Sequence, residues 1–258
     1  EEKMTLFWHG HFATSYRGIE DSYHMFLQNG FLRANALGNF KEGLVRGIIR
    51  DPAMIAYLNN NQNRPQAPNE NLARELMELF TLGEGRGYDE DDIKQGARTL
   101  TGYTFDDDAF AFRTRQHDDG VKQLFGSRGQ FTGDDFVDLI FTRPSASEFV
   151  LEKLYRFLVN DVPDGLDGEP GAVVGGLARL FERKKWEIKP ILRTLFLSRH
   201  FYEPVNVRAI IKSPIQLIVQ AVRSLSPPAR KGLLRTLATA GDLMGQRLFY
   251  PPSVKGWD

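Results

Sequence analysis

A helix that bears acidic side chains beside its apolar stripe is the feature that most constrains this chain. Residues 69–80 read NENLARELMELF. At about 100° of turn per residue, the apolar side chains fall on one stripe, made by Leu72, Leu76, Leu79 and Phe80. Glu75 lies about 60° from the direction of Leu72, and Glu78 lies about 60° further round. Burying an unpaired carboxylate is costly, so Glu75 needs an arginine, a proton or a metal ion as its partner.

The same segment offers one internal partner and clear ends. Arg74 follows Glu70 by four residues and precedes Glu78 by four, so it can pair with either carboxylate. Asn69 is a favoured N-cap residue, and Gly83 is a typical helix stop. The simplest interpretation is a salt-bridged surface helix with one partly buried glutamate. The alternative is that this helix contributes to a functional site.

Composition excludes several classes of function. The 258 residues are 41% hydrophobic and 26% charged, which is ordinary for a globular protein with a real core. Lys+Arg and Asp+Glu balance at 33 each, so we expect no nucleic acid partner. The absence of cysteine excludes disulfides and thiolate metal sites. No apolar run approaches the roughly 20 residues of a transmembrane helix. Motifs for phosphate-binding loops, serine hydrolases and zinc proteases are also missing.

The pattern along the chain is mostly helical. Helical spacing or capping signals predict further helices over 19–37, 40–58, 90–101, 134–141, 145–160, 170–184, 187–199, 208–224 and 228–244. Asp51, Asp134 and Ser145 are predicted N-caps, and Ser213-Pro214 predicts a local helix start or a kink. We therefore expect an all-α fold, a multi-helix, bundle-like domain.

Two segments interrupt the helices. Over 102–133, phenylalanines alternate with polar residues and glycines, which predicts either a short β-hairpin or an irregular loop. Residues 161–170 are rich in Pro, Gly and Asp and predict an internal loop. We expect 1–258 to form a single mainly helical domain. Because both ends look cut, we also expect a fragment of a longer chain, whose signal segment is not included.

Histidines provide the other candidate chemistry. In an extended segment, His9 and His11 would face one metal ion, whereas in a helix they would diverge by about 200°. The structural alternative is one histidine hydrogen-bonded in an aromatic cluster and one at the surface. His117 and Asp118 lie in the Phe/Gly-rich insert, where a histidine beside a carboxylate indicates a metal ligand, a general base or an ordinary turn. His200 is explained by its position near a helix C-terminus, so we do not count it as a ligand.

An ordered set of motifs resembles one protein family. The stretches that carry the resemblance are 2–15, 69–83, 88–102, 117–122, 153–157 and 252–257. Together they resemble the bacterial domain of unknown function 1800 family over nearly the whole chain. The resemblance implies a helical protein that is exported to the periplasm or the cell exterior. It also implies a second exported protein, of a sulfatase-like family, encoded beside it. No activity is assigned to the family.

The family motifs fall on the polar groups already singled out, and so imply a shared polar site. These groups are His9, His11, Glu70, Arg74, Glu75, Glu78, Arg98, His117 and Asp118. Imidazoles with carboxylates suit Zn, Mn or Fe, and helix bundles hold such sites. Our first hypothesis is an enzyme with a His/carboxylate metal centre. Its candidate metal ligands are His9, His11 and Glu75. Its candidate catalytic residues are Glu78, His117 and Asp118 as acid/base groups, with Arg74 and Arg98 for an anionic substrate.

Two other hypotheses stay open. In one, the protein is a non-catalytic scaffold or partner-binding protein, and the charged cluster is an ion-pair network that fixes helix packing. In the other, the Phe-rich insert binds carbohydrate or peptide, which exposed aromatic side chains would favour. Reaction type, substrate and oligomeric state do not follow from the sequence.

Overall fold

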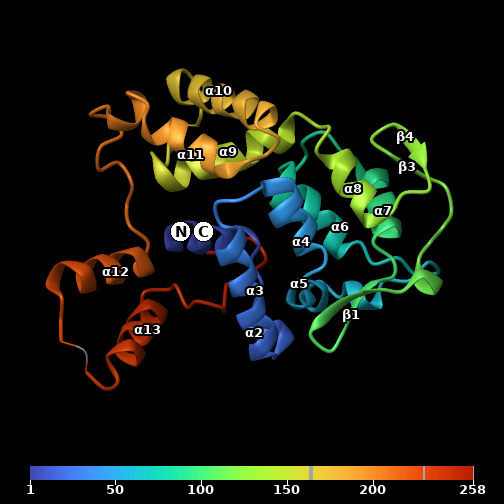
Figure 1. Cartoon of the computed structure of the whole chain (residues 1–258), viewed down its shortest axis with the longest axis horizontal. Coiled ribbons are helices and arrows are strands. Elements are labelled where there is room, and N and C mark those ends of the chain that lie inside the picture. Colours follow the sequence, from blue (N-terminus) through green and yellow to red (C-terminus); the bar gives the residue numbers. More distant parts are fainter. Residues whose placement is uncertain (163–164, 229, 258) are drawn as a thin grey trace.

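The computed structural model describes residues 1–162, 165–228 and 230–257, and the fold is mostly helical (Figure 1). This confirms the helical expectation. The α-helices in the described residues are α1 (Glu2–His11), α2 (Tyr16–Ile19), α3 (Ser22–Asn35), α4 (Arg46–Ile48), α5 (Pro52–Tyr57), α6 (Asn71–Glu75), α7 (Glu90–Thr99), α8 (Gly133–Ile140), α9 (Ser145–Leu158), α10 (Glu169–Arg183), α11 (Ile188–Phe196), α12 (Pro214–Leu225) and α13 (Leu233–Leu243). Short helical segments of other types are η1 (Phe40–Val45), η2 (Asn60–Gln62), η3 (Leu76–Thr81), η4 (Thr114–Gln116) and η5 (His200–Tyr202).

The Phe/Gly-rich insert folds as two antiparallel hairpins. Strands β1 (Tyr103–Asp106) and β2 (Ala109–Phe112) pair with Tyr103 opposite Phe112. Strands β3 (Lys122–Leu124) and β4 (Ser127–Gly129) form the second two-stranded sheet. The hairpin alternative is therefore confirmed, and the expected all-α fold becomes a mostly helical fold with two small sheets. Of the expected loop at 161–170, positions 163–164 lie outside the described residues, and α10 begins at its end.

Helix capping was predicted correctly at some starts and wrongly at others. Asp51 caps α5, and Ser213 forms a capping box at the start of α12. The prediction for Asp134 was wrong, because Thr132 caps α8 and the Asp134 carboxylate pairs with two arginines at and just after α4. The prediction for Ser145 was also wrong, because Ser145 is already the first residue of α9.

The acidic helix is not uniform. It begins as α6 and continues as η3, which is a π-helix, so its backbone winds more widely over the second half. The Thr81 hydroxyl donates to the carbonyl of Leu76 at 2.5 Å and satisfies an oxygen inside the π segment. The buried stripe consists of Leu72, Ala73, Leu76, Met77, Phe80 and Thr81. Leu79, expected in the stripe, is only partly buried.

Helix α1 lies at the centre of the core. Trp8 and Phe12 are fully buried, and both rings stack against the buried ring of Phe40. The Trp8 indole N–H donates to the carbonyl of Ala36 at 3.0 Å, just after α3. An aromatic hydrophobe with its one polar group satisfied is favourable in a core. Helix α1 therefore fixes the position of α3 against the rest of the molecule.

The C-terminal segment returns to α1, since Gly256 lies against Gly10 and the Trp257 ring packs on His9. The backbone N–H of Tyr16 donates to the carbonyl of Phe249 at 2.8 Å. Gly256 has φ +92°, and a Cβ at this position would lie 2.5 Å from the carbonyl oxygen of Gly10. Only glycine meets both demands at this contact.

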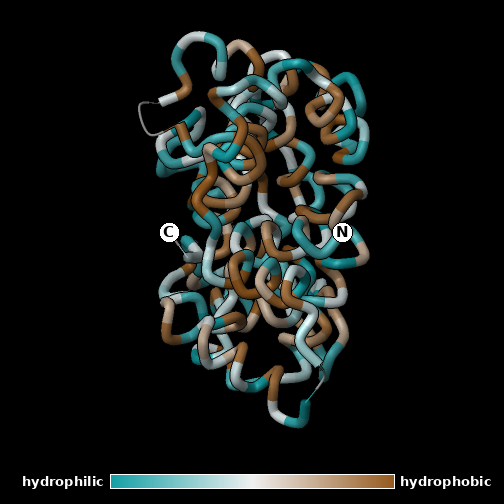
Figure 2. Tube along the Cα trace, turned by 90° about the vertical axis from the view of Figure 1, so that its left-hand side faces the viewer, coloured by the Kyte–Doolittle hydropathy of each residue, from teal (hydrophilic) through white to brown (hydrophobic). Residues whose placement is uncertain are grey.

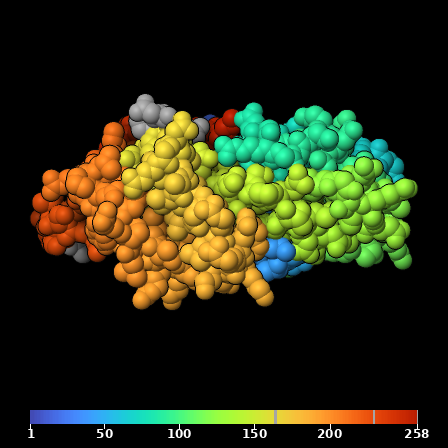
Figure 3. Space-filling view, turned by 90° about the horizontal axis from the view of Figure 1, so that it is seen from above, coloured from blue at the N-terminus to red at the C-terminus, as the bar shows by residue number. Residues whose placement is uncertain are grey.

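Helices α12 and α13 form one end of the molecule, at the left of Figure 1 and at the orange-to-red end of the space-filling view in Figure 3. No side chain of α12 is buried. Large apolar side chains on the two helices are exposed: Leu217, Val219, Leu225, Leu234 and Leu243. Figure 2 shows hydrophobic and hydrophilic residues alternating along this end. Among the described residues, no helix is both long and apolar enough to cross a membrane.

We predict that Gly256→Ala destabilises the protein by about 2–4 kcal/mol, from a left-handed backbone cost of about 1–2 kcal/mol and a steric cost of similar size. Gly245→Ala is the matched control, because Gly245 has the same φ of +92° and nothing within 4 Å of its would-be Cβ. The Gly245→Ala variant should lose only the stability that corresponds to the left-handed backbone, about 1–2 kcal/mol. Urea unfolding with Trp fluorescence measures both. Equal losses for the two variants would show that the contact with Gly10 is unimportant.

Candidate functional site

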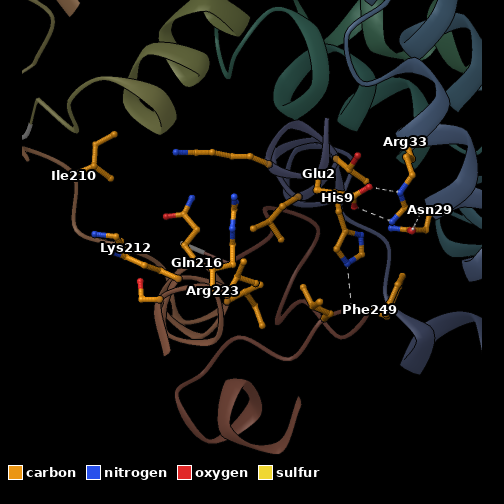
Figure 4. Close-up of a pocket in the computed structure, with 17 residues that line it drawn as sticks. Glu2, His9, Asn29, Arg33, Ile210, Lys212, Gln216, Arg223 and Phe249 are labelled. Atoms are coloured by element: carbon orange, nitrogen blue, oxygen red, sulfur yellow. Dashed lines mark hydrogen bonds and ion pairs between the residues drawn. The ribbon is translucent and has the colours of Figure 1, made fainter. Parts of the chain in front are cut away.

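His9 binds the backbone of the C-terminal segment. Its Nε2 accepts the N–H of Phe249 at 3.1 Å (Figure 4). The imidazole packs against the rings of Phe249 and Trp257, with centroids 4.9 and 5.2 Å away. Burial lowers the pKa of His9 to about 4. At neutral pH His9 is therefore uncharged, with its proton on Nδ1.

His11 binds a different part of the chain. It is buried among aromatic rings, and its Nε2 lies 2.9 Å from the carbonyl oxygen of Phe80. Since a carbonyl only accepts, Nε2 bears the proton. Burial, followed by the charge of Lys153, holds the pKa of His11 well below its usual range. Because α1 is helical, the two histidines leave it in different directions.

The carboxylates of the acidic helix have their own partners. Arg74 pairs with Glu70 at 3.0 Å, with Glu78 at 3.3 Å and with Glu90 at 2.9 Å. Burial, and then the charge of Glu78, raise the pKa of Glu75. In the part of the chain that the structure describes, Glu75 forms no ion pair with an arginine and no hydrogen bond with a histidine. The sequence predicted Arg74 pairing correctly, and Glu75 is the carboxylate left outside the network.

The motif in the insert is also internally paired. Arg98 binds Asp118 with both ends of its guanidinium, through Nε–Oδ2 at 2.7 Å and Nη2–Oδ1 at 3.1 Å. This arginine lowers the pKa of Asp118. Lys122 is buried and donates to the carbonyls of Asp118 and Gly120. His117 Nδ1 donates to the carbonyl of Thr101 at 2.9 Å. These contacts fasten the insert to α7.

The motifs singled out in the sequence therefore form three sets of contacts. His9 and His11 are on α1, the Arg74 network joins α6 and η3 to Glu90 on α7, and Arg98 on α7 binds Asp118 of the insert. Their roles as metal ligands or catalytic groups stay predictions. Across the described residues, one group of His and acidic side chains has ligand atoms that all lie within 4.8 Å of one another. It consists of Glu169, His200 and Glu203, none of which was predicted.

This Glu169–His200–Glu203 cluster joins two helical segments. Glu169 is the first residue of α10, and His200 starts η5, which places Glu203 directly after that turn. His200 Nδ1 lies 3.2 Å from Glu169 Oε1 and 3.2 Å from Glu203 Oε2. The His200 side chain is 8% exposed, against 63% for Glu169 and 27% for Glu203. The cluster thus has a buried imidazole and one side open to solvent.

The far side of the imidazole is held by two polar groups. The Tyr155 hydroxyl lies 2.8 Å from His200 Nε2, and Asn206 Nδ2 lies 3.2 Å from the same atom. Asn206 also donates to the backbone carbonyl of His200 at 2.8 Å. Burial, and then the negative charges of Glu169 and Glu203, raise the pKa of Tyr155. These contacts fix the ring so that Nδ1 points at the two carboxylates.

Sequence reasoning missed this cluster for a physical reason. The helix dipole already explained a histidine near the end of α11, so no ligand role was assigned to His200. The spacing of His200 and Glu203 is a local signal, because residues three apart share a helix face. Glu169 is 31 positions away and comes close only through the packing of α10 against α11.

The aromatic side chains of the insert are mostly packed. Phe105, Phe110, Phe125 and Phe131 are partly buried, and Phe112 is 39% exposed. Phe110, Phe125 and Phe131 pack against the main core. This counts against the hypothesis of a carbohydrate or peptide module, which needs a row of exposed rings.

We predict that His9 gives the protein an acid-sensitive component of stability. Its folded pKa of about 4 lies below the unfolded value of about 6.5, so the unfolded state takes up the proton first. The stability due to neutral His9 is complete above pH 6.5 and is lost as the pH falls towards 4, by about 3 kcal/mol in total. His9→Gln removes this loss. Urea unfolding should therefore show that the free energy of unfolding of the variant, relative to that of the wild type, is higher at pH 4.5 than at pH 7.

Asp51→Asn is the control, because the stability that Asp51 contributes changes with pH in the opposite direction. Burial raises the pKa of Asp51 to about 6, so its contribution to stability increases as the pH falls from about 6 to about 4. The free energy of unfolding of this variant should therefore fall relative to that of the wild type as the pH decreases over that range. If His9→Gln differs from the wild type by the same amount at both pH values, the assignment of a neutral, buried His9 is wrong.

Comparison with known proteins identifies the family. A search of curated proteins and a search of solved structures find no match. The family model described as "Protein of unknown function (DUF1800)" matches residues 1–258. This agrees with the resemblance carried by the ordered motifs. The chain belongs to the DUF1800 family of proteins of unknown function.

Proposed function

We propose that this protein binds a divalent metal ion through Glu169, His200 and Glu203, and that the cluster is its site of chemistry. One observation carries the proposal. A single imidazole nitrogen faces two carboxylate oxygens at 3.2 Å each. Among the described residues, no lysine or arginine pairs with either glutamate. The proposal keeps the His/carboxylate centre expected from the family resemblance and assigns it to other residues.

The distances support a metal site. Zn²⁺ bonds to His nitrogen and carboxylate oxygen are about 2.0–2.2 Å long, so neighbouring ligand atoms in a tetrahedral site lie about 3.3 Å apart. The two Nδ1–O distances in the cluster are close to this value. One imidazole with two carboxylates suits Zn or Mn, and also Fe.

A shared proton is the competing interpretation, because an Nδ1–H donated to the two carboxylates gives the same distances. The charges favour the metal. The two carboxylates at this imidazole repel each other, and hydrogen bonds from Nδ1 leave at least one of their negative charges unbalanced. A divalent cation at the same point balances both charges.

The surroundings fit a working centre. Histidine ligands of metals normally donate from their second ring nitrogen to an oriented partner, and with Nδ1 on the metal the Nε2–H of His200 would donate to the Tyr155 hydroxyl oxygen at 2.8 Å. Of its two hydrogen bonds to His200, Asn206 would then keep only the one to the backbone carbonyl. Glu169 is largely exposed, so the remaining coordination position faces solvent, as in catalytic rather than structural zinc sites. A metal ion at this place would act as a Lewis acid on a carbonyl or phosphoryl oxygen of a substrate.

We predict one saturable site for Zn²⁺ or Mn²⁺ on protein prepared with chelator and then freed of it, measured by isothermal titration calorimetry. Glu203→Gln, which keeps the size of the side chain, should weaken binding at least tenfold because a ligand charge is lost. Tyr155→Phe should weaken it about tenfold, as expected for an orienting partner. Glu148→Gln is the matched control, since Glu148 is an exposed glutamate on α9 outside the cluster.

Absence of saturable binding would overturn the proposal. So would Glu203→Gln binding metal as well as Glu148→Gln does. If Glu203→Gln lowers the thermal stability of a protein that binds no metal, the cluster is a structural hydrogen-bond network.

The family membership also supports two proposals about the setting of the protein. One is export to the periplasm or the cell exterior, and the other is action beside a second exported protein of a sulfatase-like family. Fractionation of bacterial cells tests the first, and co-purification from the exported fraction tests the second. Recovery of the full-length protein in the cytoplasm alone would exclude both.

A further inference from the structure

A groove lies between the N-terminal helices α1 and α3 and the C-terminal helix α12. Its volume is about 740 Å³, within the range of small-molecule sites. One wall comes from α1 and α3, and the other comes from residues 210–224, which include most of α12 (Figure 4). In Figure 4, Glu2, His9 and Arg33 lie on one side, and Lys212, Gln216 and Arg223 lie on the other.

The groove has an apolar lining. The hydrophobic residues that line it are Leu6, Ile210, Ile215, Val219, Leu248 and Phe249. Val219 is half exposed, although it sits on the face of α12 that borders the groove. Apolar surface left in a concave site favours a ligand with a hydrophobic body.

The groove carries an excess of positive charge. Its cationic side chains include Lys3, Lys212 and Arg223, and none of the three forms an ion pair with a carboxylate within the described residues. The Lys3 ammonium lies 5.4 Å from the centroid of the Phe157 ring. Burial, and then the charge of Lys212, lower the pKa of Lys3, which means that the two ammonium groups repel each other. An anion bound between them would remove this repulsion.

The remaining titratable groups of the groove do not balance these charges. Among the described residues that line the groove, Glu2 is the only carboxylate, and Arg33 neutralises it with hydrogen bonds of 2.9 and 3.2 Å. His9 is uncharged at neutral pH, because burial lowers its pKa to about 4. Lys3, Lys212 and Arg223 therefore leave three positive charges beside an apolar floor.

We propose that this groove binds a monomeric amphipathic anion, with an aliphatic chain on the apolar lining and a carboxylate or phosphate head group between Lys3, Lys212 and Arg223. The proposal is independent of the metal cluster, because the two share no residue.

Titration of the full chain with laurate and with dodecyl phosphate, each below its micelle concentration, tests the proposal by calorimetry. We expect saturable one-to-one binding. The double variant Lys212→Gln/Arg223→Gln should weaken it at least tenfold. The matched control is Lys231→Gln/Arg235→Gln, which removes the same charge from exposed positions at the start of α13 that do not line the groove. Dodecyltrimethylammonium, with the same chain and the opposite charge, should not bind.

Three outcomes would overturn the proposal. The first is equal weakening by the two double variants, and the second is equal affinity for the cationic amphiphile. The third is binding of the protein to anionic vesicles without binding of monomeric laurate, which would show a general surface attraction. Weak binding of inorganic phosphate that is lost in Lys212→Gln/Arg223→Gln, beside tight binding of dodecyl phosphate, would support both the head-group and the chain assignments.

Discussion

Three hydrogen bonds from neighbouring residues of α1 hold separate parts of this molecule together. Trp8 donates to the backbone after α3, His11 donates to the backbone of η3, and His9 accepts from the C-terminal segment. All three side chains are buried, where an unpaired polar group is costly and a bonded one is stabilising. His9 can accept only as a neutral ring with its proton on Nδ1, whereas His11 donates from Nε2, and burial lowers the pKa of both. The family motif at 2–15 thus contacts the motif at 69–83 through His11 and Phe80, and the motif at 252–257 through His9 and Trp257.

This arrangement changes where chemistry is expected. The arginines of the other motifs already have carboxylate partners, Arg74 in a network and Arg98 in a two-point contact with Asp118. Two clusters of charged groups without an oppositely charged residue lie elsewhere among the described residues. They are the acidic pair around His200, and the cations of the groove beside α12. His9 has a structural role and also lies at the groove, because it binds the C-terminal segment and forms part of the groove wall.

Much of the fold was predictable because helical periodicity and capping are local. Asp51 and Ser213 were recognised as helix starts from neighbouring residues alone, and the structure confirms both. The π segments η1 and η3 were not predicted, because the apolar spacing was read at the 100° per residue of a regular α-helix. Asp134 was misassigned because its carboxylate is used by arginines almost 90 positions away. Glu169 and His200 were missed as a pair because only tertiary packing brings them together.

Long-range proton–nitrogen spectra of the imidazole rings, recorded while Zn²⁺ is added, test this division of roles most directly. The structure predicts a proton on Nδ1 of His9 and on Nε2 of His11, with neither ring affected by the metal. The signals of His200 should change as one equivalent is bound. If the signals of His9 and His11 change while those of His200 do not, this assignment of roles is contradicted, and the metal site lies on α1.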